Sequence, residues 1–320
     1  MIIALLLLLG GLVLTVYGAN WLVDGASSLA KKMKISNLVI GLTVVALGTS
    51  MPEFVVSFIS SLNGNTDIAI GNVVGSNIVN VLLILGISSM VYPITVQHST
   101  VWKEIPFTLL ASLVLFFMAN DFLIDGASAS AVSRIDGLIL LCFFLIFIYY
   151  SFETSKNSNE TGQLVVKIFP LWKSVLLMVL GIFGLVAGGK LLVTGAVDIA
   201  RLLGISEAVI GLTVVAIGTS VPELATSVVA AMKKNSDIAM GNVVGSNIFN
   251  IFFILGTSAT VAPLPFNPAM NTDLIICIAT SLLLFGFMFT GEKSKITRTE
   301  GFLFTLAYVA YTVYLVITSV

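Results

Sequence analysis

The sequence predicts an all-α membrane protein in which ten transmembrane helices form two inverted five-helix repeats. Of its 320 residues, 58% are hydrophobic and only 10% are charged, which excludes a soluble two-domain protein. Apolar stretches of about 20 residues, enough to cross a hydrocarbon core of ~30 Å, recur ten times. The predicted spans are 2–24, 36–61, 68–91, 105–120, 133–151, 172–200, 207–231, 238–262, 273–290 and 300–319.

The first span is expected to stay in the mature protein. Its apolar run starts directly after Met1 without a basic segment and continues through Leu22, which is too long for the core of a cleaved signal peptide. Polar or proline-rich clusters mark the breaks between later spans. These clusters lie at 31–34, 63–67, 157–160, 233–237 and 263–268.

The basic residues predict the orientation of the spans. Of the 15 Lys and Arg residues, all but Arg134, Lys190 and Arg201 fall on the side of the 31–34 loop. By the positive-inside rule that side is cytoplasmic, so both termini are expected outside and the 152–171 linker inside. The expected location is the plasma (inner) membrane.

Several classes of function are excluded. With 15 basic and 16 acidic residues the formal charge is −1, which leaves no basic surface for nucleic acid. Cys142 and Cys277 lie apart in apolar runs, so no thiolate metal site is expected, and the single histidine, His98, lies in a loop. No pair of nucleophile and base appears, so the protein is not expected to be an enzyme or to carry a prosthetic group. The expected surroundings are lipid, with no obligate protein partner.

The chain contains an internal duplication. A shift of 170 residues aligns 39–86 with 209–256 without a gap, and about 30 of the 48 positions are identical. The chain then divides into a first repeat (1–151), a linker (152–171) and a second repeat (172–320). Because five spans is an odd number, the second repeat enters the membrane inverted. Inverted repeats place a substrate site at mid-membrane and open it alternately to either side, which predicts a transporter.

A proline is expected to break the helix in the middle of one span of each repeat. Pro52 lacks an amide hydrogen and clashes with the carbonyl of Gly48, so the helix should bend beside Glu53. Thr49 and Ser50 share the helix face of Glu53. Carbonyls loosened by the break are tolerable at this depth only if protein, water or an ion satisfies them. The second repeat offers Thr219, Ser220, Pro222 and Glu223, and the loosened carbonyls are those of 46–49 and 216–219.

A polar stripe follows in the next span of each repeat. Asn72, Ser76 and Asn80 are spaced by four residues, and Gly71 and Gly75 leave a smooth face that lets helices approach closely. The alternative interpretation of these polar residues is hydrogen bonding between helices. The second repeat carries Gly241, Asn242, Gly245, Ser246 and Asn250 at the matching positions.

The two mid-membrane glutamates, Glu53 and Glu223, have no Lys, Arg or His in the spans that carry these motifs. A charge at this depth costs roughly 2.5–3.5 kcal/mol, so protons or bound cations must neutralise the pocket. The available ligands are oxygens, which favours hard cations such as Ca²⁺ and Na⁺. The alternative is that both glutamates are permanently protonated structural residues.

The segments Gly48-Thr-Ser-Met-Pro-Glu53 and Gly218-Thr-Ser-Val-Pro-Glu223, with Gly-Ser-Asn-Ile at 75–78 and 245–248, resemble the paired alpha repeats (39–86 and 209–256) of the calcium/cation antiporter superfamily, in particular prokaryotic sodium/calcium exchangers. The resemblance implies exchange of Ca²⁺ for Na⁺, with the first and sixth helices sliding across the rest. The cation ligands that it implies are the side chains of Thr49, Ser50, Glu53, Ser76, Asn80, Thr219, Ser220, Glu223 and Ser246 and the carbonyls of Ala46 and Ala216.

One position departs from the family pattern. Members that use Na⁺ often have an aspartate where this chain has Asn250, so the site offers two carboxylates, with Asn250 as a neutral oxygen ligand. The nearest alternative is an exchanger coupled to H⁺, although that branch usually carries Gly-Asn-x-x-Glu in place of Gly-Thr-Ser-x-Pro-Glu. A cation channel with an acidic ring is a further alternative, which the inverted repeat disfavours.

Two further features have structural interpretations. Asp67 and Asp237 begin their spans, where an aspartate caps free amides. Lys190 is the one basic residue predicted in a span interior, where it could reach toward the membrane surface.

Overall fold

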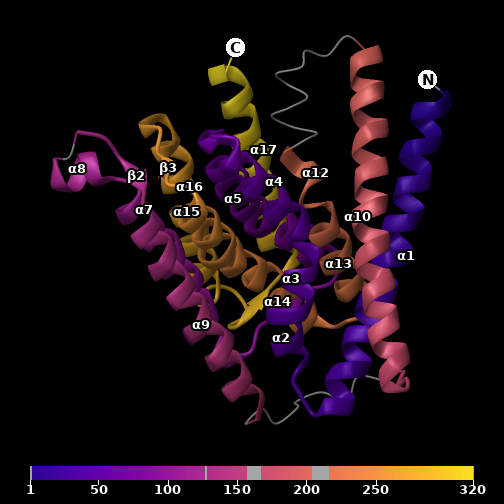
Figure 1. The fold of residues 1–320 in the computed structure, drawn as a ribbon. Coiled ribbons are helices and arrows are strands. Elements are labelled where there is room, and N and C mark those ends of the chain that lie inside the picture. Colours follow the sequence, from indigo (N-terminus) through magenta and orange to yellow (C-terminus); the bar gives the residue numbers. More distant parts are fainter. Residues whose placement is uncertain (1, 127, 157–166, 204–215, 320) are drawn as a thin grey trace.

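The computed structural model describes residues 2–126, 128–156, 167–203 and 216–319, which form a bundle of long helices (Figure 1). The first helix begins and the last helix ends at the same end of the bundle. We call the end of the bundle at which the first helix finishes the Met33 side, and the opposite end the Leu62 side.

Most of the described helices are long and apolar enough to cross a membrane, so the chain is a helical integral membrane protein. A bent pair, Asn37–Thr49 and Met51–Leu62, adds a ninth span to eight single ones. The predicted span 207–231 is described only from residue 216 onward, where it contains the shorter apolar helix Val221–Met232. The eight helices are Ile2–Met33, Thr66–Val91, Thr100–Met118, Arg134–Glu153, Leu171–Ile199, Ser236–Val261, Pro268–Phe287 and Arg298–Ile317.

The first half of the chain begins with a single long helix and continues with helices that contain π-helical segments. Its elements are α1 (Ile2–Met33), α2 (Asn37–Ile40), η1 (Gly41–Val45), α3 (Ala46–Thr49), α4 (Met51–Leu62), α5 (Thr66–Ile78), η2 (Val79–Leu85), α6 (Gly86–Val91), β1 (Ile94–Thr95), η3 (Thr100–Glu104), α7 (Ile105–Met118), α8 (Asp121–Asp125), β2 (Ala131–Val132) and α9 (Arg134–Lys156).

Where it is described, the second half follows a similar order of elements, except that α8 has no counterpart between α16 and β4 and that η6 is a 3₁₀-helix where η3 is a π-helix. Its elements are α10 (Leu171–Leu202), α12 (Ala216–Gly218), α13 (Val221–Met232), α14 (Ser236–Ile248), η5 (Phe249–Leu255), α15 (Gly256–Val261), β3 (Leu264–Pro265), η6 (Pro268–Met270), α16 (Asn271–Phe287), β4 (Lys295–Ile296) and α17 (Arg298–Ser319).

The proline break is confirmed in both halves. Ser50 leaves the helical conformation (φ −81°, ψ 8°) between α3 and α4, and the two helices meet at a bend of 50°. Ser220 takes nearly the same conformation (φ −88°, ψ 8°) before α13. Pro52 and Pro222 then occupy the first turn of the new helix, where a missing amide hydrogen costs nothing.

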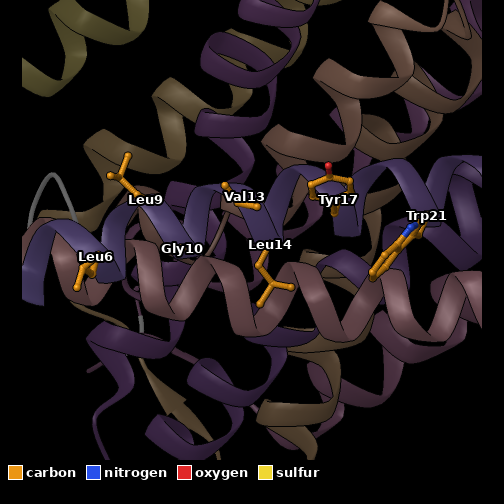
Figure 2. A pocket seen from close by; sticks show the side chains of 7 residues that line it. All are labelled: Leu6, Leu9, Gly10, Val13, Leu14, Tyr17 and Trp21. Carbon is orange, nitrogen blue, oxygen red and sulfur yellow. The ribbon is translucent and has the colours of Figure 1, made fainter.

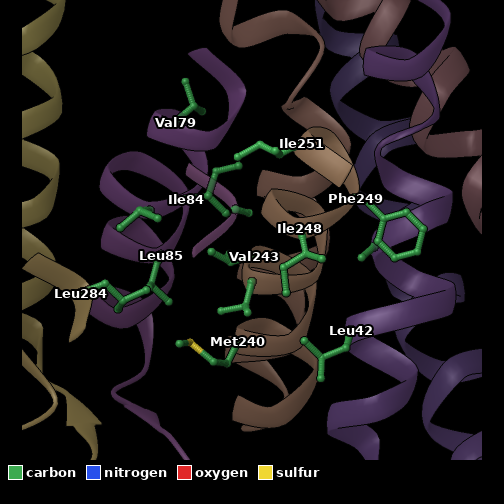
Figure 3. Packing of buried hydrophobic residues seen from close by; sticks show 14 of the residues in the cluster. Leu42, Val79, Ile84, Leu85, Met240, Val243, Ile248, Phe249, Ile251 and Leu284 are labelled. Atoms are coloured by element: carbon green, nitrogen blue, oxygen red, sulfur yellow. The ribbon is translucent and has the colours of Figure 1, made fainter. Parts of the chain in front are cut away.

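Two helices form the centre of the bundle. Over an apolar stretch of 18 residues in each helix, 94% of the residues are buried in Ser236–Val261 and 72% in Thr66–Val91, against 28% in α1 and 33% in α10. Figure 3 shows apolar side chains of these two helices packed together. Leu42 of η1 and Phe249 of η5 lie on the side of α14 that faces away from Ile84 and Leu85. The polar residues of both repeats therefore lie in the interior, and α1 and α10 lie at the periphery.

Glycines let α14 approach the start of the bent span. A Cβ atom added at Gly241 would lie 2.8 Å from the carbonyl oxygen of Leu38 and 2.9 Å from the amide nitrogen of Leu42. The close approach expected of Gly241 and Gly245 is thereby confirmed. The partners expected for Gly71 and Gly75 in the other half fall in 204–215, outside the described residues.

The long helices α1 and α10 lie side by side and antiparallel at one edge of the bundle (Figure 1). Backbone meets backbone along their contact, because Gly18 of α1 faces Gly181 and Gly184 of α10. The opposite face of α1 is an apolar surface. Figure 2 shows Leu6, Leu9, Gly10, Val13, Leu14, Tyr17 and Trp21 along a shallow groove on it.

Short strands connect the halves at both ends of the bundle. On the Met33 side β1 pairs with β4, and on the Leu62 side β2 pairs with β3, both antiparallel. Each pair joins a strand of one half to a strand of the other. The two pairs are therefore equivalent under exchange of the halves.

Helix ends differ from the predicted spans at α1, which continues to Met33 instead of ending at residue 24. Hydropathy marks where the apolar segment ends, and Asp24, Lys31 and Lys32 do not interrupt backbone hydrogen bonding.

Arg134 and Arg298 begin α9 and α17 after matching capping pairs. The Ser133 amide donates to Asp136 at 2.7 Å, and the Thr297 amide donates to Glu300 at 2.7 Å.

Gly241→Ala should lower the stability of the protein by about 1–3 kcal/mol, because the new methyl group would overlap backbone atoms of Leu38 and Leu42 that cannot rotate away. Thermal unfolding in detergent measures the effect. Gly10→Ala is the control, since a Cβ there meets no other described atom within 4 Å. Equal unfolding temperatures of the two variants would contradict the packing described above.

Candidate functional site

Glu53 and Glu223 lie beside the two helix breaks, and the fold buries both almost completely. Their side chains are 1% and 0% exposed. Among the described residues neither carboxylate forms an ion pair with Lys, Arg or His. Two carboxylates without counter-charges therefore occupy the interior of a membrane protein.

Each carboxylate accepts a hydrogen bond from the opposite repeat. Ser50 donates to Glu223 Oε1 at 2.9 Å, and Ser220 donates to Glu53 Oε1 at 3.0 Å. The serine next to one break therefore satisfies the glutamate next to the other. Neither repeat builds this arrangement alone.

The serines of the polar stripe join the same contacts. Ser50 also lies 3.0 Å from Ser246 Oγ, and Ser220 lies 3.2 Å from Ser76 Oγ. Ser76 is in addition 3.5 Å from Glu53 Oε1. The structure thus brings four predicted serines into contact with one another or with the glutamates.

Asn72 and Asn242 support the breaks. Asn242 Nδ2 donates to the backbone carbonyl of Glu223 at 3.2 Å and to Ser227 at 3.0 Å. Its Oδ1 accepts from Thr49 at 3.0 Å. In the other half Asn72 bonds to the Glu53 carbonyl (3.2 Å), Ser57 (2.9 Å) and Thr219 (3.5 Å).

Asparagines connect the two central helices. Asn80 Nδ2 donates to Asn247 Oδ1 at 2.8 Å, and Asn250 Nδ2 donates to Asn77 Oδ1 at 2.9 Å. Asn77 and Asn247 in turn donate to each other's backbone carbonyl at 3.2 and 3.3 Å. These bonds use the amide nitrogens of Asn80 and Asn250, so their oxygens face away from the asparagine contacts.

Among the described residues, several buried side-chain oxygens have no hydrogen-bond partner, and four of them belong to predicted site residues that are equivalent under exchange of the repeats. A carboxylate oxygen that no donor satisfies is unusual in a protein interior, where most polar atoms are paired. We call these four atoms the oxygen cluster. They are Glu53 Oε2, Glu223 Oε2, Asn80 Oδ1 and Asn250 Oδ1.

The chemistry of this set suits a hard cation, since carboxylate and amide oxygens are ligands of Ca²⁺ and Na⁺. Within the described part of the chain no three His, Cys, Asp or Glu side chains come together as a metal site. A cation here would therefore be held by two carboxylates and by neutral oxygens.

One of the two carbonyls predicted as ligands is less available than expected. The carbonyl of Ala46 already accepts hydrogen bonds from the Ser50 amide (3.0 Å) and Thr49 Oγ1 (3.3 Å). Ala216 is the first residue of α12 and adjoins the undescribed residues 204–215.

Four residues that contact the site were not predicted from the sequence: Ser57, Ser227, Asn77 and Asn247. All four are identical between the repeats, and Ser57 lies four residues after Glu53 on the same helix face. Duplication together with helical spacing would have identified the serines. Asn77 lies one position off the four-residue stripe, so only the packing of the two central helices reveals its role.

The expected capping role of Asp67 and Asp237 is wrong, because the N-cap residues are Asn65 and Asn235. Both aspartates nevertheless lie in the first helical turn, where an acidic side chain interacts favourably with the helix dipole. The residue before α14 is Asn235, and its side chain accepts from the Ile238 amide at 3.2 Å. Asp237 instead accepts from Gln97 at 2.8 Å, and Asp67 accepts from Asn267 at 3.3 Å. Both aspartates therefore link a first helical turn to a loop of the other repeat.

The remaining residues of interest form no hydrogen bond with the glutamates in the described part of the chain. His98 packs near Trp102, with ring centroids 6.4 Å apart. Cys142 is exposed and Cys277 is buried, and both are free thiols. Lys190 lies on α10, beside a cavity considered below.

A family model and the sequences of related proteins point to the same family. Residues 3–153 and 173–317 match the family described as sodium/calcium exchanger protein. The chain is 37% identical to the putative antiporter CaxA of Alkalimonas amylolytica, over 97% of this chain and 98% of that protein. It is 35% identical to the sodium/calcium exchanger MaX1 of Methanosarcina acetivorans, over 97% of each chain.

Solved structures give the same fold. The sodium-calcium exchanger NCX_Mj soaked with zero Na⁺ and Ca²⁺ superposes with a TM-score of 0.83 at 35% identity, covering 97% of each chain. The same exchanger soaked with 2.5 mM Na⁺ and 0.1 mM Ca²⁺ superposes with a TM-score of 0.82.

Asn247→Ala should lower stability by about 1–3 kcal/mol, because Asn80 Nδ2 loses its acceptor and the buried carbonyl of Asn77 loses its donor. Thermal unfolding in detergent, with and without Ca²⁺, tests this. The matched control is Asn63→Ala, since Asn63 is exposed at the end of α4. If the two variants unfolded at the same temperature, the asparagine contacts would not support the site.

Proposed function

The chain belongs to the sodium/calcium exchanger family, a family of transporters and not enzymes, and from this premise we propose that it exchanges Ca²⁺ for Na⁺ by alternating access at the oxygen cluster. The observation that carries the proposal is the pair of buried carboxylates without a cationic partner, each bonded to a serine of the other repeat. Such a pocket needs bound cations or protons to balance its charge.

The proposed ligands are the residues of both repeats around the two breaks. Two carboxylates carry a charge of −2, so one Ca²⁺ or two Na⁺ would leave the site neutral and three Na⁺ would leave it at +1. Neutral oxygens must supply the rest of the six to eight ligands that Ca²⁺ prefers. The proposed set is Glu53, Glu223, Thr49, Ser50, Thr219, Ser220, Ser76, Asn80, Ser246 and Asn250, with the carbonyls of Ala46 and Ala216.

The architecture that we propose is ten spans in two inverted repeats, 1–151 and 172–320, joined by the linker 152–171. Apart from α8, the described halves have a similar order of elements, and the strand pairs β1–β4 and β2–β3 each join one half to the other. The span 207–231 would complete the second repeat. The basic residues of the Met33 side favour placing that side in the cytoplasm, with both termini outside and the protein in the plasma (inner) membrane.

Alternating access is supported by a difference between the two sides. On the Met33 side α1 is tied to α13 and the turn after it: Lys233 pairs with Asp24 at 2.6 Å, and Asn235 donates to Ser27 at 3.1 Å. On the Leu62 side the corresponding part of α10 borders a cavity of about 490 Å³. The equivalent valines show the contrast, since Val23 of α1 is 1% exposed and Val193 of α10 lines the cavity.

Exchange can be tested in everted membrane vesicles loaded with Na⁺ and diluted into radioactive Ca²⁺. Uptake should require an outward Na⁺ gradient and should collapse when external Na⁺ equals internal Na⁺. Two protonated carboxylates would also make the pocket neutral, so coupling to H⁺ is the second candidate. Uptake driven by a pH gradient and indifferent to Na⁺ would establish that candidate and overturn ours.

Glu53→Gln and Glu223→Gln should each reduce Na⁺-dependent Ca²⁺ uptake to background while the protein stays folded, because each removes half of the site's negative charge and leaves its shape. Uptake in vesicles and thermal unfolding in detergent are the two measurements. Glu292→Gln, which removes an exposed carboxylate, is the control and should transport normally. Transport retained by both single variants would refute the site.

Asp24→Asn should favour opening on the Met33 side, since it removes the ion pair that holds α1 to Lys233. A cysteine in place of Val23, which is buried beside this pair, should then react about two- to fivefold faster with a membrane-impermeant thiol reagent from that side. Glu292→Gln breaks an ion pair of equal length elsewhere and serves as the control. Equal labelling rates in the two backgrounds would show that the pair does not hold α1.

A further inference from the structure

Lys190 stands out because it is a charged residue of one repeat without a charged counterpart in the other. The ligands proposed above occur in both halves at a shift of 170 residues, whereas the residue equivalent to Lys190 is Asn20. Asn20 contributes only a backbone carbonyl to the contact with Lys233, at 3.2 Å. The duplicated site therefore has a positive charge near it on one side.

The cavity on the Leu62 side connects Lys190 with the second helix break. Among the described residues it is lined by α4, α10 and the start of α13, and it includes Gly218, Thr219 and Pro222. Gly189, the neighbour of Lys190, faces this break, because a Cβ there would lie 3.8 Å from Val221 and 3.9 Å from Pro222. The lysine thus shares a cavity with Thr219, which bonds to Asn72 at the site.

Lys190 is the one charged side chain among the described residues that line the cavity, and most of the others are apolar. Its side chain is exposed, and among the described residues no carboxylate pairs with it. Ionisable side chains within membrane spans usually face water-filled pathways, because facing hydrocarbon is costly. A cavity of about 490 Å³ has room for on the order of ten waters at ~30 Å³ each.

We propose that Lys190 is a specificity-determining residue, a fixed positive charge in the Leu62-side access cavity that disfavours Ca²⁺ more strongly than Na⁺. The work of bringing an ion to a fixed potential is proportional to its charge. A potential that lowers Na⁺ occupancy by a given factor therefore lowers Ca²⁺ occupancy by the square of that factor. Lys190 would slow Ca²⁺ binding from this side and speed its release, without changing the net direction that the gradients impose.

The inference rests on the proposed function and is tested on the same exchange reaction, with apparent affinities for Na⁺ and Ca²⁺ measured on the Leu62 side. Lys190→Gln should raise the Na⁺ affinity by about threefold and the Ca²⁺ affinity by about tenfold, so that the logarithmic change for Ca²⁺ is twice that for Na⁺. Lys190→Arg should match the parent. Lys190→Glu should extend the trend in the direction of Lys190→Gln, and added inert salt should reduce all of these differences.

Lys173→Gln is the matched control, because Lys173 lies on the same helix near Phe169 and outside the cavity. It should leave both affinities unchanged. Equal factors for Na⁺ and Ca²⁺ in Lys190→Gln would indicate a structural effect, and no change would place the ammonium group outside the ion path; either result overturns the inference alone. A parent protein without Na⁺-dependent Ca²⁺ flux would instead overturn the proposed function, and this inference with it.

Discussion

Glu53 and Glu223 are buried and have no cationic partner among the described residues, and much of the structure depends on how the fold compensates for this. Transfer of a carboxylate from water into a protein interior costs several kcal/mol. Here part of the compensation crosses the repeats, because Ser50 bonds to Glu223 and Ser220 bonds to Glu53. The two halves must therefore meet at the helix breaks, and they do so with α5 and α14 at the centre of the bundle. The contacts that hold the halves together leave one oxygen of each carboxyl group without a hydrogen-bond partner among the described residues.

The contacts of the two repeats are equivalent around the central helices α5 and α14 but differ at the outer helices α1 and α10. Hydrogen bonds around the glutamates and asparagines occur in matching pairs, as expected if one site must serve both sides of the membrane. The contacts of α1 and α10 with the rest of the bundle do not match. Asp24 and Lys233 form an ion pair, whereas Thr194 and Asn63 stand at the equivalent positions and cannot form one. The two ends of the bundle therefore differ in amino-acid sequence as well as in conformation.

The sequence predicted those features that depend on local chemistry or on the duplication. Pro52 had to interrupt its helix, and the matched motifs identified Glu53 and Ser50 together with their counterparts. It did not predict contacts that arise when distant helices pack. Asn77 lies off the polar stripe and becomes important only because Asn250 of the other central helix donates to it. The cavity beside Lys190 likewise forms between α4, α10 and α13, so spacing along one helix could not indicate it.

The asparagine contacts give a physical reason for the count of two carboxylates. Asn250 Nδ2 donates to Asn77 Oδ1, and a carboxylate at position 250 would have no hydrogen to donate there. Two acceptor oxygens would then face one another unless the Asn77 amide turned over. That rotation would replace its Nδ2 by an oxygen opposite the carbonyl of Asn247, to which Nδ2 now donates. An amide at position 250 satisfies all of these contacts and still directs its oxygen into the oxygen cluster. An amide at position 250 is therefore built into the packing of α5, η2, α14 and η5, and it leaves Glu53 and Glu223 as the two carboxyl groups of the candidate site.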